Sequence, residues 1–210
     1  MQKIGAVLAV VLLITPVAEA VPAGFPTEEV NNYEGLHAYF NFAPYTTAQF
    51  EQQRTMPSGR VLRSKGYFEY RRGVGMMWRT DLPARTAMVI SRDWMVVYGS
   101  RGQELRRTAL EGSPAARYTT VFLDGAKPDN LDALSRAFRV TCRVEGKRLV
   151  LGFQALREGM DLRWLMVDVV GGNVNRVAYS SGRQGDTVIL FKGVKNGEKV
   201  PTAPFRLLTR

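Results

Sequence analysis

The residues that could do chemistry are few and lie far apart in the sequence. The chain contains one histidine, His37, and one cysteine, Cys142. A histidine-rich metal site is therefore excluded, and a Ser-His-Asp triad would depend on a single residue. Residues 99–102 (GSRG) have the wrong spacing for the nucleophile elbow of hydrolases, and residues 73–75 (GVG) precede a strand, not the helix of a dinucleotide site. We therefore expect a protein that is not an enzyme and holds no metal or cofactor.

Cys142 would need His37 as its base to act as a nucleophile. A lone thiol cannot form an internal disulfide, and its place in an alternating strand predicts burial without reactivity. Asp161 and Asp168 lie on or near one strand, but paired carboxylates at this spacing are common by chance. A hydrolase acting on lipids stays an alternative, and it would depend on His37 or Cys142.

The N-terminus predicts export. Lys3 supplies a positive start, residues 4–14 are apolar, and residues 18–20 (AEA) fit the small-x-small cleavage rule. An uncleaved membrane anchor is the alternative, but the apolar run is short for a span. No cysteine lies at the cleavage site, so the mature N-terminus is not lipidated. We expect a signal peptide over residues 1–20, cleaved near Ala20, and a single domain over residues 21–210.

Composition limits the partners that this domain can have. The 210 residues are 45% hydrophobic, which allows one domain with a sizeable core. The net charge of +10 is spread along the chain, without a basic block interleaved with aromatic residues. This pattern argues against nucleic acid as a partner and favours attraction to anionic membrane surfaces.

The remaining chain alternates between polar and apolar residues in about a dozen short segments, which predicts an antiparallel sheet curled into a barrel or sandwich. Helices are predicted from Thr27 through Phe40 and, as an insertion between strands, over residues 113–125 and 128–138. Asn196-Gly197 predicts a type I′ hairpin turn. Strands are predicted at residues 60–71, 74–80, 85–90, 94–98, 104–109, 138–144 and 149–155.

One hairpin carries more apolar surface, aimed one way, than a short hairpin needs. Phe68, Tyr70, Met76 and Trp78 all occupy even positions and are large. Such side chains ordinarily form a packed core, and from the pattern alone a core is the favoured interpretation. The alternative is the wall of a soft, adaptable ligand cavity. Further inward positions are predicted at Leu165, Val167, Val177, Tyr179, Ile189 and Phe191.

Phe50 and Gln52 share one predicted strand, and the next hairpin contains Gly66, Phe68, Arg72, Met76 and Trp78. With this pattern, residues 46–100 resemble the LolA-type outer-membrane lipoprotein carriers of the bacterial periplasm. Phe50 and Gln52 match the family's aromatic-x-Gln strand, and Pro83 with residues 89–93 match its later turn and hairpin. Three positions depart from the family pattern: Gly73 replaces a proline, Gly75 an apolar residue and Met76 a phenylalanine. The central element matches without a gap at Gly66, Phe68, Arg72, Met76 and Trp78.

The resemblance implies a mainly β fold, a half-open antiparallel barrel of about eleven strands with helices as a lid over a hydrophobic cavity. It implies a monomeric periplasmic carrier that takes acylated lipoprotein or lipid from an inner-membrane transporter to an outer-membrane acceptor. Arg72 would latch the lid. The alternative is a sensor or scaffold of the same fold without transfer activity. The implied cavity wall comprises Phe50, Phe68, Tyr70, Met76, Trp78, Val89, Leu151, Phe153, Leu165 and Val167.

Overall fold

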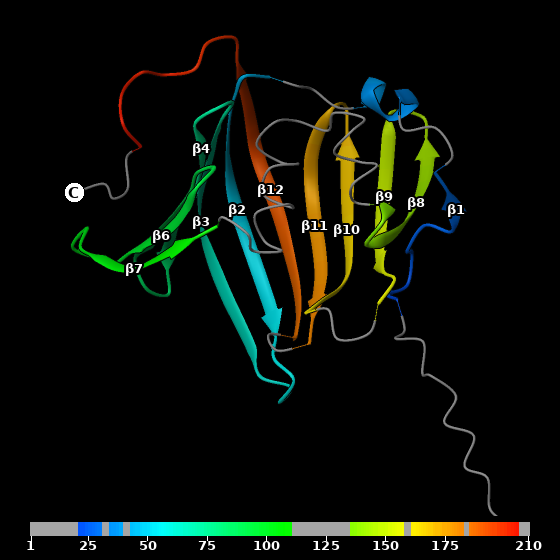
Figure 1. Ribbon diagram of the computed structural model, residues 1–210, viewed down its shortest axis with the longest axis horizontal. Coiled ribbons are helices and arrows are strands. Elements are labelled where there is room, and N and C mark those ends of the chain that lie inside the picture. Colours follow the sequence, from blue (N-terminus) through cyan, green and yellow to red (C-terminus); the bar gives the residue numbers. More distant parts are fainter. Residues whose placement is uncertain are drawn as a thin grey trace, which may run out of the picture.

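The computed structural model describes residues 21–30, 34–39, 43–110, 135–157, 161–182 and 185–205. These residues form twelve strands and one short 3-10 helix (Figure 1). The elements are β1 (Glu28–Glu29), η1 (Glu34–Tyr39), β2 (Tyr45–Thr55), β3 (Val61–Arg71), β4 (Gly75–Leu82), β5 (Thr86–Ile90), β6 (Trp94–Tyr98), β7 (Glu104–Ala109), β8 (Phe138–Glu145), β9 (Arg148–Ala155), β10 (Leu162–Val170), β11 (Asn173–Ser181) and β12 (Gly185–Gly197).

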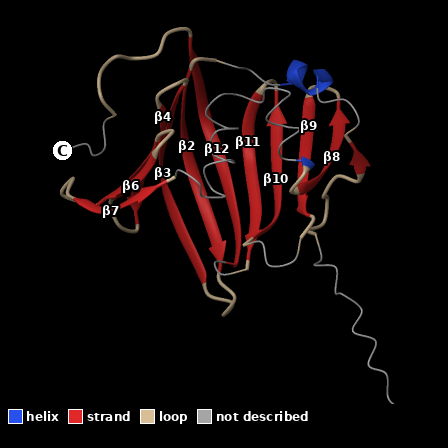
Figure 2. Ribbon diagram, viewed as in Figure 1, coloured by secondary structure: helices blue, strands red, loops and turns tan. Residues whose placement is uncertain are grey.

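All twelve strands belong to one antiparallel sheet in the order β1-β8-β9-β10-β11-β12-β2-β3-β4-β5-β6-β7, seen as the red strands of Figure 2. The mainly β, antiparallel prediction is confirmed. Twelve strands stand where a half-open barrel of about eleven was predicted, and the sheet is open, because among the described residues its edge strands β1 and β7 do not pair with each other. The exposed charged residues of β7, which include Glu104 and Arg107, suit a strand that ends a sheet.

The first predicted helix is wrong at its start. Glu28 and Glu29 form β1, which pairs with Cys142 and Thr141 of β8, and the described helical part of this segment is η1, Glu34–Tyr39. Local capping signals are overridden here by pairing with a distant strand. The predicted lid segment over residues 113–134 lies outside the described residues, and Phe138 begins β8. No helix in the described part of the chain is long and apolar enough to cross a membrane.

The predicted turn at Asn196-Gly197 is also wrong. Both residues belong to the end of β12 and pair with Thr46 and Tyr45 of β2. The strand is irregular between Lys192 and Lys195, which shifts its register before the Asn-Gly pair. Pairing between the long strands β12 and β2 therefore determines the conformation of a segment whose local sequence favours a turn.

Two clusters of buried apolar side chains lie on opposite faces of the sheet at β8–β11. On one face, Val30 and Tyr39 pack against the cluster. On the other, the ring of Phe25 meets Trp164 edge-on, with centroids 6.4 Å apart. Coverage of both faces explains why β9 is apolar at nearly every position. The first cluster comprises Phe138, Val140, Leu149, Leu151, Phe153, Val167 and Val169, and the second Val150, Trp164, Met166 and Ala178.

Two glycines of the β3–β4 turn should respond differently to alanine. Gly75 has φ +152°, and a Cβ there would lie 2.4 Å from the carbonyl oxygen of Ile90. Gly73 has φ +72° with nothing within 4 Å. Gly73→Ala should cost about 1–2 kcal/mol of stability from backbone strain, and Gly75→Ala about 1–3 kcal/mol more from the clash. Urea unfolding midpoints measure this difference, and equal shifts would contradict it.

Candidate functional site

The register of β2–β4 brings the predicted residues of the opening hairpin together. Residues directly opposite each other in antiparallel strands project to the same face, as do alternate residues along a strand. Phe68 lies opposite Trp78, and Tyr70 lies opposite Met76. Phe50 lies on the same face, because Ala48, two residues before it, pairs with Phe68. We call this side of the sheet the aromatic face.

The predicted residues of β9 and β10 lie on the aromatic face as well. Leu151 is opposite Val167, and Phe153 is opposite Leu165. A row of residues that lie opposite one another on neighbouring strands shows that this is the same face. It starts on β10, crosses β11 and β12, and ends on β2 two residues from Phe50. The row runs through Val167, Val177, Ile189 and Gln52.

Val89 is the one predicted wall residue that the structure does not bring to this face. It lies opposite Met77 and Val96, whose side chains are 0% and 5% exposed, on the other side of the sheet. Its neighbour Met88 is opposite Trp78 and takes the position on the aromatic face. Residues 87–90 (AMVI) are apolar throughout, so the sequence pattern does not indicate which of them face which side of the sheet.

Four aromatic rings form a cluster on the aromatic face. Trp78 contacts Phe68 with centroids 4.7 Å apart and Phe191 at 5.6 Å. Phe50 meets Trp78 edge-on at 5.3 Å, and Phe68 lies 5.5 Å from Phe191. Tilted and edge-to-face pairs at these distances are favourable beyond the area that they bury. Phe191 of β12 therefore joins the three rings that the family resemblance selects.

Burial differs between the two ends of the aromatic face. At β8–β10, Leu149 and Val169 are 0% exposed and belong to a closed core. At β3–β4 the large side chains of Phe68, Met76 and Trp78 are only half-buried. A sheet face that is closed at one end and partly open over aromatic side chains at the other leaves apolar area able to receive a ligand.

Arg72, the predicted latch, lies in the turn after β3 and is exposed. Its backbone amide donates to the carbonyl of Pro44 at 2.8 Å. In the described part of the chain its guanidinium makes no ion pair or hydrogen bond. The lid that it would hold falls on residues outside the described ranges, so the latch stays a prediction.

The preceding residue, Arg71, is the buried arginine of this hairpin. Its side chain and that of Glu69 are 7% and 5% exposed, and they form an ion pair with Nη2 to Oε1 at 2.6 Å. Arg71 also donates to the carbonyls of Pro201 (3.2 Å) and Ala203. Its guanidinium stacks 4.4 Å from the ring centre of Phe205. The arginine thereby fixes the C-terminal segment against the side of the sheet opposite the aromatic face.

The surroundings of this pair are poorly solvated. Burial raises the pKa of Tyr45 to about 12, with smaller contributions from Glu69 and Tyr67. A cation enclosed in such a site needs a carboxylate partner, which Glu69 supplies. The sequence pattern could place Arg71 on the side away from Phe68 and Tyr70, but its partners in the C-terminal segment lie more than 100 residues away.

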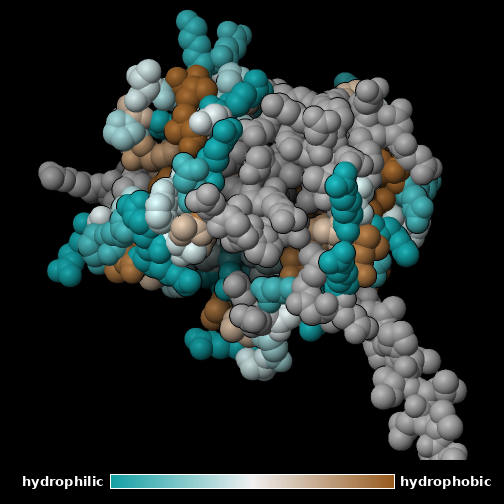
Figure 3. All heavy atoms as spheres, viewed as in Figure 1, coloured by the Kyte–Doolittle hydropathy of each residue, from teal (hydrophilic) through white to brown (hydrophobic). Residues whose placement is uncertain are grey.

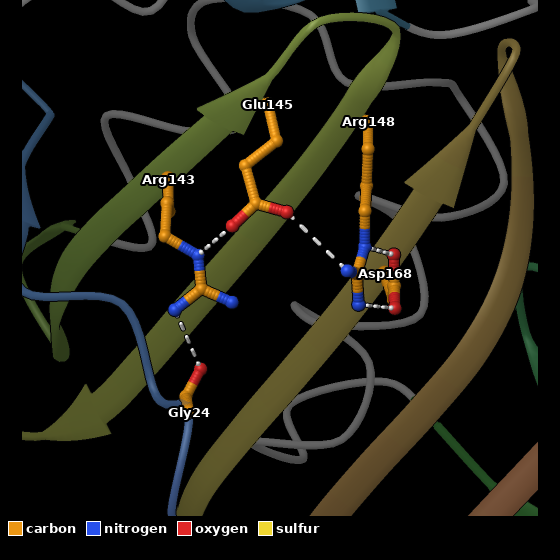
Figure 4. A network of polar contacts seen from close by, with 5 residues as sticks. All are labelled: Gly24, Arg143, Glu145, Arg148 and Asp168. Atoms are coloured by element: carbon orange, nitrogen blue, oxygen red, sulfur yellow. Dashed lines mark hydrogen bonds and ion pairs between the residues drawn. The ribbon is translucent and has the colours of Figure 1, made fainter.

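A second polar network lies on the same side of the sheet at β8–β10 (Figure 4). Arg148 donates two hydrogen bonds to the carboxylate of Asp168, at 3.0 Å and 2.7 Å, and this contact raises the pKa of Arg148. Arg143 pairs with Glu145 at 2.8 Å and donates to the carbonyl of Gly24 at 3.3 Å. These contacts tie the N-terminal segment and neighbouring strands together, so we read Asp168 as structural.

The thiol of Cys142 is half-buried at the β1–β8 pairing. Burial, and to a smaller degree Glu28, raises its pKa, which lowers its nucleophilicity at neutral pH. His37 lies in η1, and its side chain is not among those described. Among the residues that the structure describes, no group of three or more histidine, cysteine, aspartate or glutamate side chains could hold a metal ion.

An open groove of about 540 Å³ lies mainly on the side opposite the aromatic face, along β12, β2 and β3. Its lining includes the charged residues Glu51, Arg63 and Lys65 and the apolar residues Val188 and Leu190. Figure 3 shows hydrophobic and hydrophilic residues interspersed over the described surface on the side that it views. The groove is separate from the aromatic cluster, and its mixed lining does not continue the wall predicted for a ligand.

No protein-family model matches the sequence, and no curated protein matches it. Solved structures do match. A LolA superfamily protein from Nitrosomonas europaea is 10% identical over 85% of this chain and 96% of its own, with a TM-score of 0.40. A putative outer membrane lipoprotein-sorting protein domain from Vibrio parahaemolyticus is 8% identical over 80% of this chain and 92% of its own, with a TM-score of 0.42.

An uncharacterized conserved protein from Thermus thermophilus is 6% identical over 80% of this chain and 88% of its own, with a TM-score of 0.48. With TM-scores below 0.5, these similarities carry no assignment of activity to this chain. In fold, the chain is similar to LolA superfamily and lipoprotein-sorting proteins.

Proposed function

We propose that this protein is an exported, periplasmic carrier that binds the acyl chains of a lipoprotein or lipid along the aromatic face. The observation that carries the proposal is the convergence of the half-buried side chains Phe68, Met76, Trp78 and Phe191 with the buried Phe50 on one face of the sheet. These positions come from β2, β3, β4 and β12, so their shared orientation is a property of the sheet and not of one hairpin.

The energetics suit a carrier. Burial of an acyl chain contributes about 0.8 kcal/mol per methylene group, so a chain lying along several strands would be held firmly. Release then requires a second state in which part of that apolar contact is lost. Arg72, exposed at the rim of the hairpin, stays our proposed latch for a lid over this face. Lipidated cargo would come from an inner-membrane donor and pass to an outer-membrane acceptor.

The signal peptide over residues 1–20 and the single domain over residues 21–210 belong to the same proposal. Neither the resemblance nor the absence of a catalytic pattern in the sequence favours hydrolysis of the bound lipid. A lipid-binding sensor or scaffold would use the same face but would not pass its ligand on. Carrier and sensor are therefore separated by transfer, not by binding.

Purified mature protein should contain acylated lipid or lipopeptide that organic extraction and mass spectrometry detect. Incubation with acceptor vesicles should then move intact lipid to the vesicles. Retention of the lipid would support the sensor, and fatty acid released from it would support a lipid hydrolase. A protein that purifies without lipid and fails to take up fatty acid from vesicles would contradict both binding functions.

A further inference from the structure

The aromatic face itself carries an arginine, Arg54. This residue is near the end of β2, four residues after Phe50, with Thr187 of β12 opposite it on one side and Leu62 of β3 on the other. Strands rise about 3.4 Å per residue, so the backbone of Arg54 is about 14 Å from that of Phe50. A charged side chain thus lies at one end of the apolar face that we propose for acyl chains.

Arg54 and Thr187 each hold a buried polar atom that has no partner among the described residues. The Nε atom of Arg54 is buried without a hydrogen bond, and the Oγ1 atom of Thr187, a residue 0% exposed, is unpartnered in the same way. No ion pair involves Arg54 within the described residues. Other arginines on the sheet do have carboxylate partners, as Arg71 has Glu69 and Arg148 has Asp168.

Unpaired buried polar groups are uncommon because each loses its hydrogen bonds to water without replacement. The hydroxyl of Ser181, on the neighbouring strand β11, donates to Asp161 at 3.1 Å and is bonded to neither of the two atoms. Two adjacent unpartnered groups on a half-open apolar face therefore indicate a ligand atom that completes them.

The chemistry of the two side chains selects that atom. A guanidinium is a donor only, with planar geometry that matches carboxylate and phosphate oxygens, and a threonine hydroxyl can donate beside it. The net charge of +10 also attracts anions to the protein. An anionic group bound at Arg54 would leave an attached acyl chain free to extend along β2 and β12 onto the aromatic cluster.

We propose that Arg54 and Thr187 bind the anionic group, a carboxylate or a phosphate, of an amphiphile whose acyl chain lies on the aromatic face. This inference rests on the proposed function and narrows its ligands to anionic amphiphiles. Arg54 sets the preference for the head group, and the aromatic cluster supplies affinity for the chain.

The test compares oleate with oleyl alcohol, which share one chain and differ in the head group, by displacement of a neutral fluorescent probe from the mature protein. Oleate should bind about 10- to 100-fold more tightly, the range expected of charge-assisted hydrogen bonds. Arg54→Met should remove this preference by weakening oleate binding, and its circular dichroism spectrum should match that of the unaltered protein, which shows that the variant is folded. Thr187→Val should weaken oleate binding by a smaller factor.

Arg63→Met is the matched control, because Arg63 is exposed on the other side of the sheet, opposite Gln53. It should keep the oleate preference. Equal affinities for oleate and oleyl alcohol, or an oleate preference that survives Arg54→Met, would overturn the anion site while acyl binding stands. If inorganic phosphate displaces the probe as well as oleyl phosphate does, the site binds a free anion, and the proposal that its ligand is an amphiphile is wrong. Failure of both oleate and oleyl alcohol to bind would overturn the proposed function itself.

Discussion

Replacing Arg71 with leucine should lower the free energy of unfolding by about 3–5 kcal/mol, because it leaves the buried carboxylate of Glu69 without its cation. The pair is enclosed on the side of the sheet away from the aromatic face, and the two side chains are 7% and 5% exposed. The same change removes the donors to the Pro201 and Ala203 carbonyls and the cation under the Phe205 ring. Urea unfolding followed by circular dichroism measures the loss.

Arg72→Leu is the matched control for this loss. Arg72 is the next residue, carries the same charge and is exposed, so its replacement should change stability by no more than about 0.5 kcal/mol. Replacing both Glu69 and Arg71 with leucine should recover part of the single variant's loss, since an apolar pair costs less than an unpaired buried charge. Equal destabilisation by Arg71→Leu and Arg72→Leu would show that the ion pair does not stabilise the fold.

These neighbouring arginines show what sequence reasoning could and could not reach. Alternation with Phe68 and Tyr70 could place Arg71 and Glu69 on the opposite side of β3. It could not show that Arg71 is buried, because the carbonyls that cover it lie 130 and 132 residues further along the chain. Arg72 was selected because it matches a position of the family motif. Such a match does not indicate whether a side chain is buried.

The strands show the same division between local and distant causes. β6 and β7 have the bounds that the sequence predicts, 94–98 and 104–109, because the glycines Gly99 and Gly102 mark the turn that separates these two short segments. β1 was predicted as helix because Thr27 and the following glutamates fit a helix start, yet pairing with β8 determines it. The side of the sheet that a residue faces could be predicted where apolar and charged residues alternate. It could not be predicted at Val89, which lies in a continuous apolar run.

Phe68→Ala should weaken binding of a long-chain amphiphile by about 10- to 100-fold, as expected for the loss of one large apolar contact. Phe68 belongs to the aromatic cluster, 4.7 Å from Trp78 and 5.5 Å from Phe191 between ring centres. Oleyl alcohol is the appropriate ligand, since its affinity does not depend on an anionic head group. Fluorescence displacement at a temperature well below unfolding gives the affinity.

Tyr67→Ala is the matched control, because Tyr67 is adjacent, aromatic and half-buried but lies on the other side of β3, where the guanidinium of Arg79 lies 5.2 Å from its ring centre. Both variants remove a partly buried ring and should lose comparable stability. A packed core and a ligand-binding face then predict different results. If the aromatic face is only core, Phe68→Ala lowers stability as Tyr67→Ala does and leaves ligand affinity equal in the two variants. If the face binds acyl chains, affinity falls in Phe68→Ala alone, because only that ring would touch the ligand.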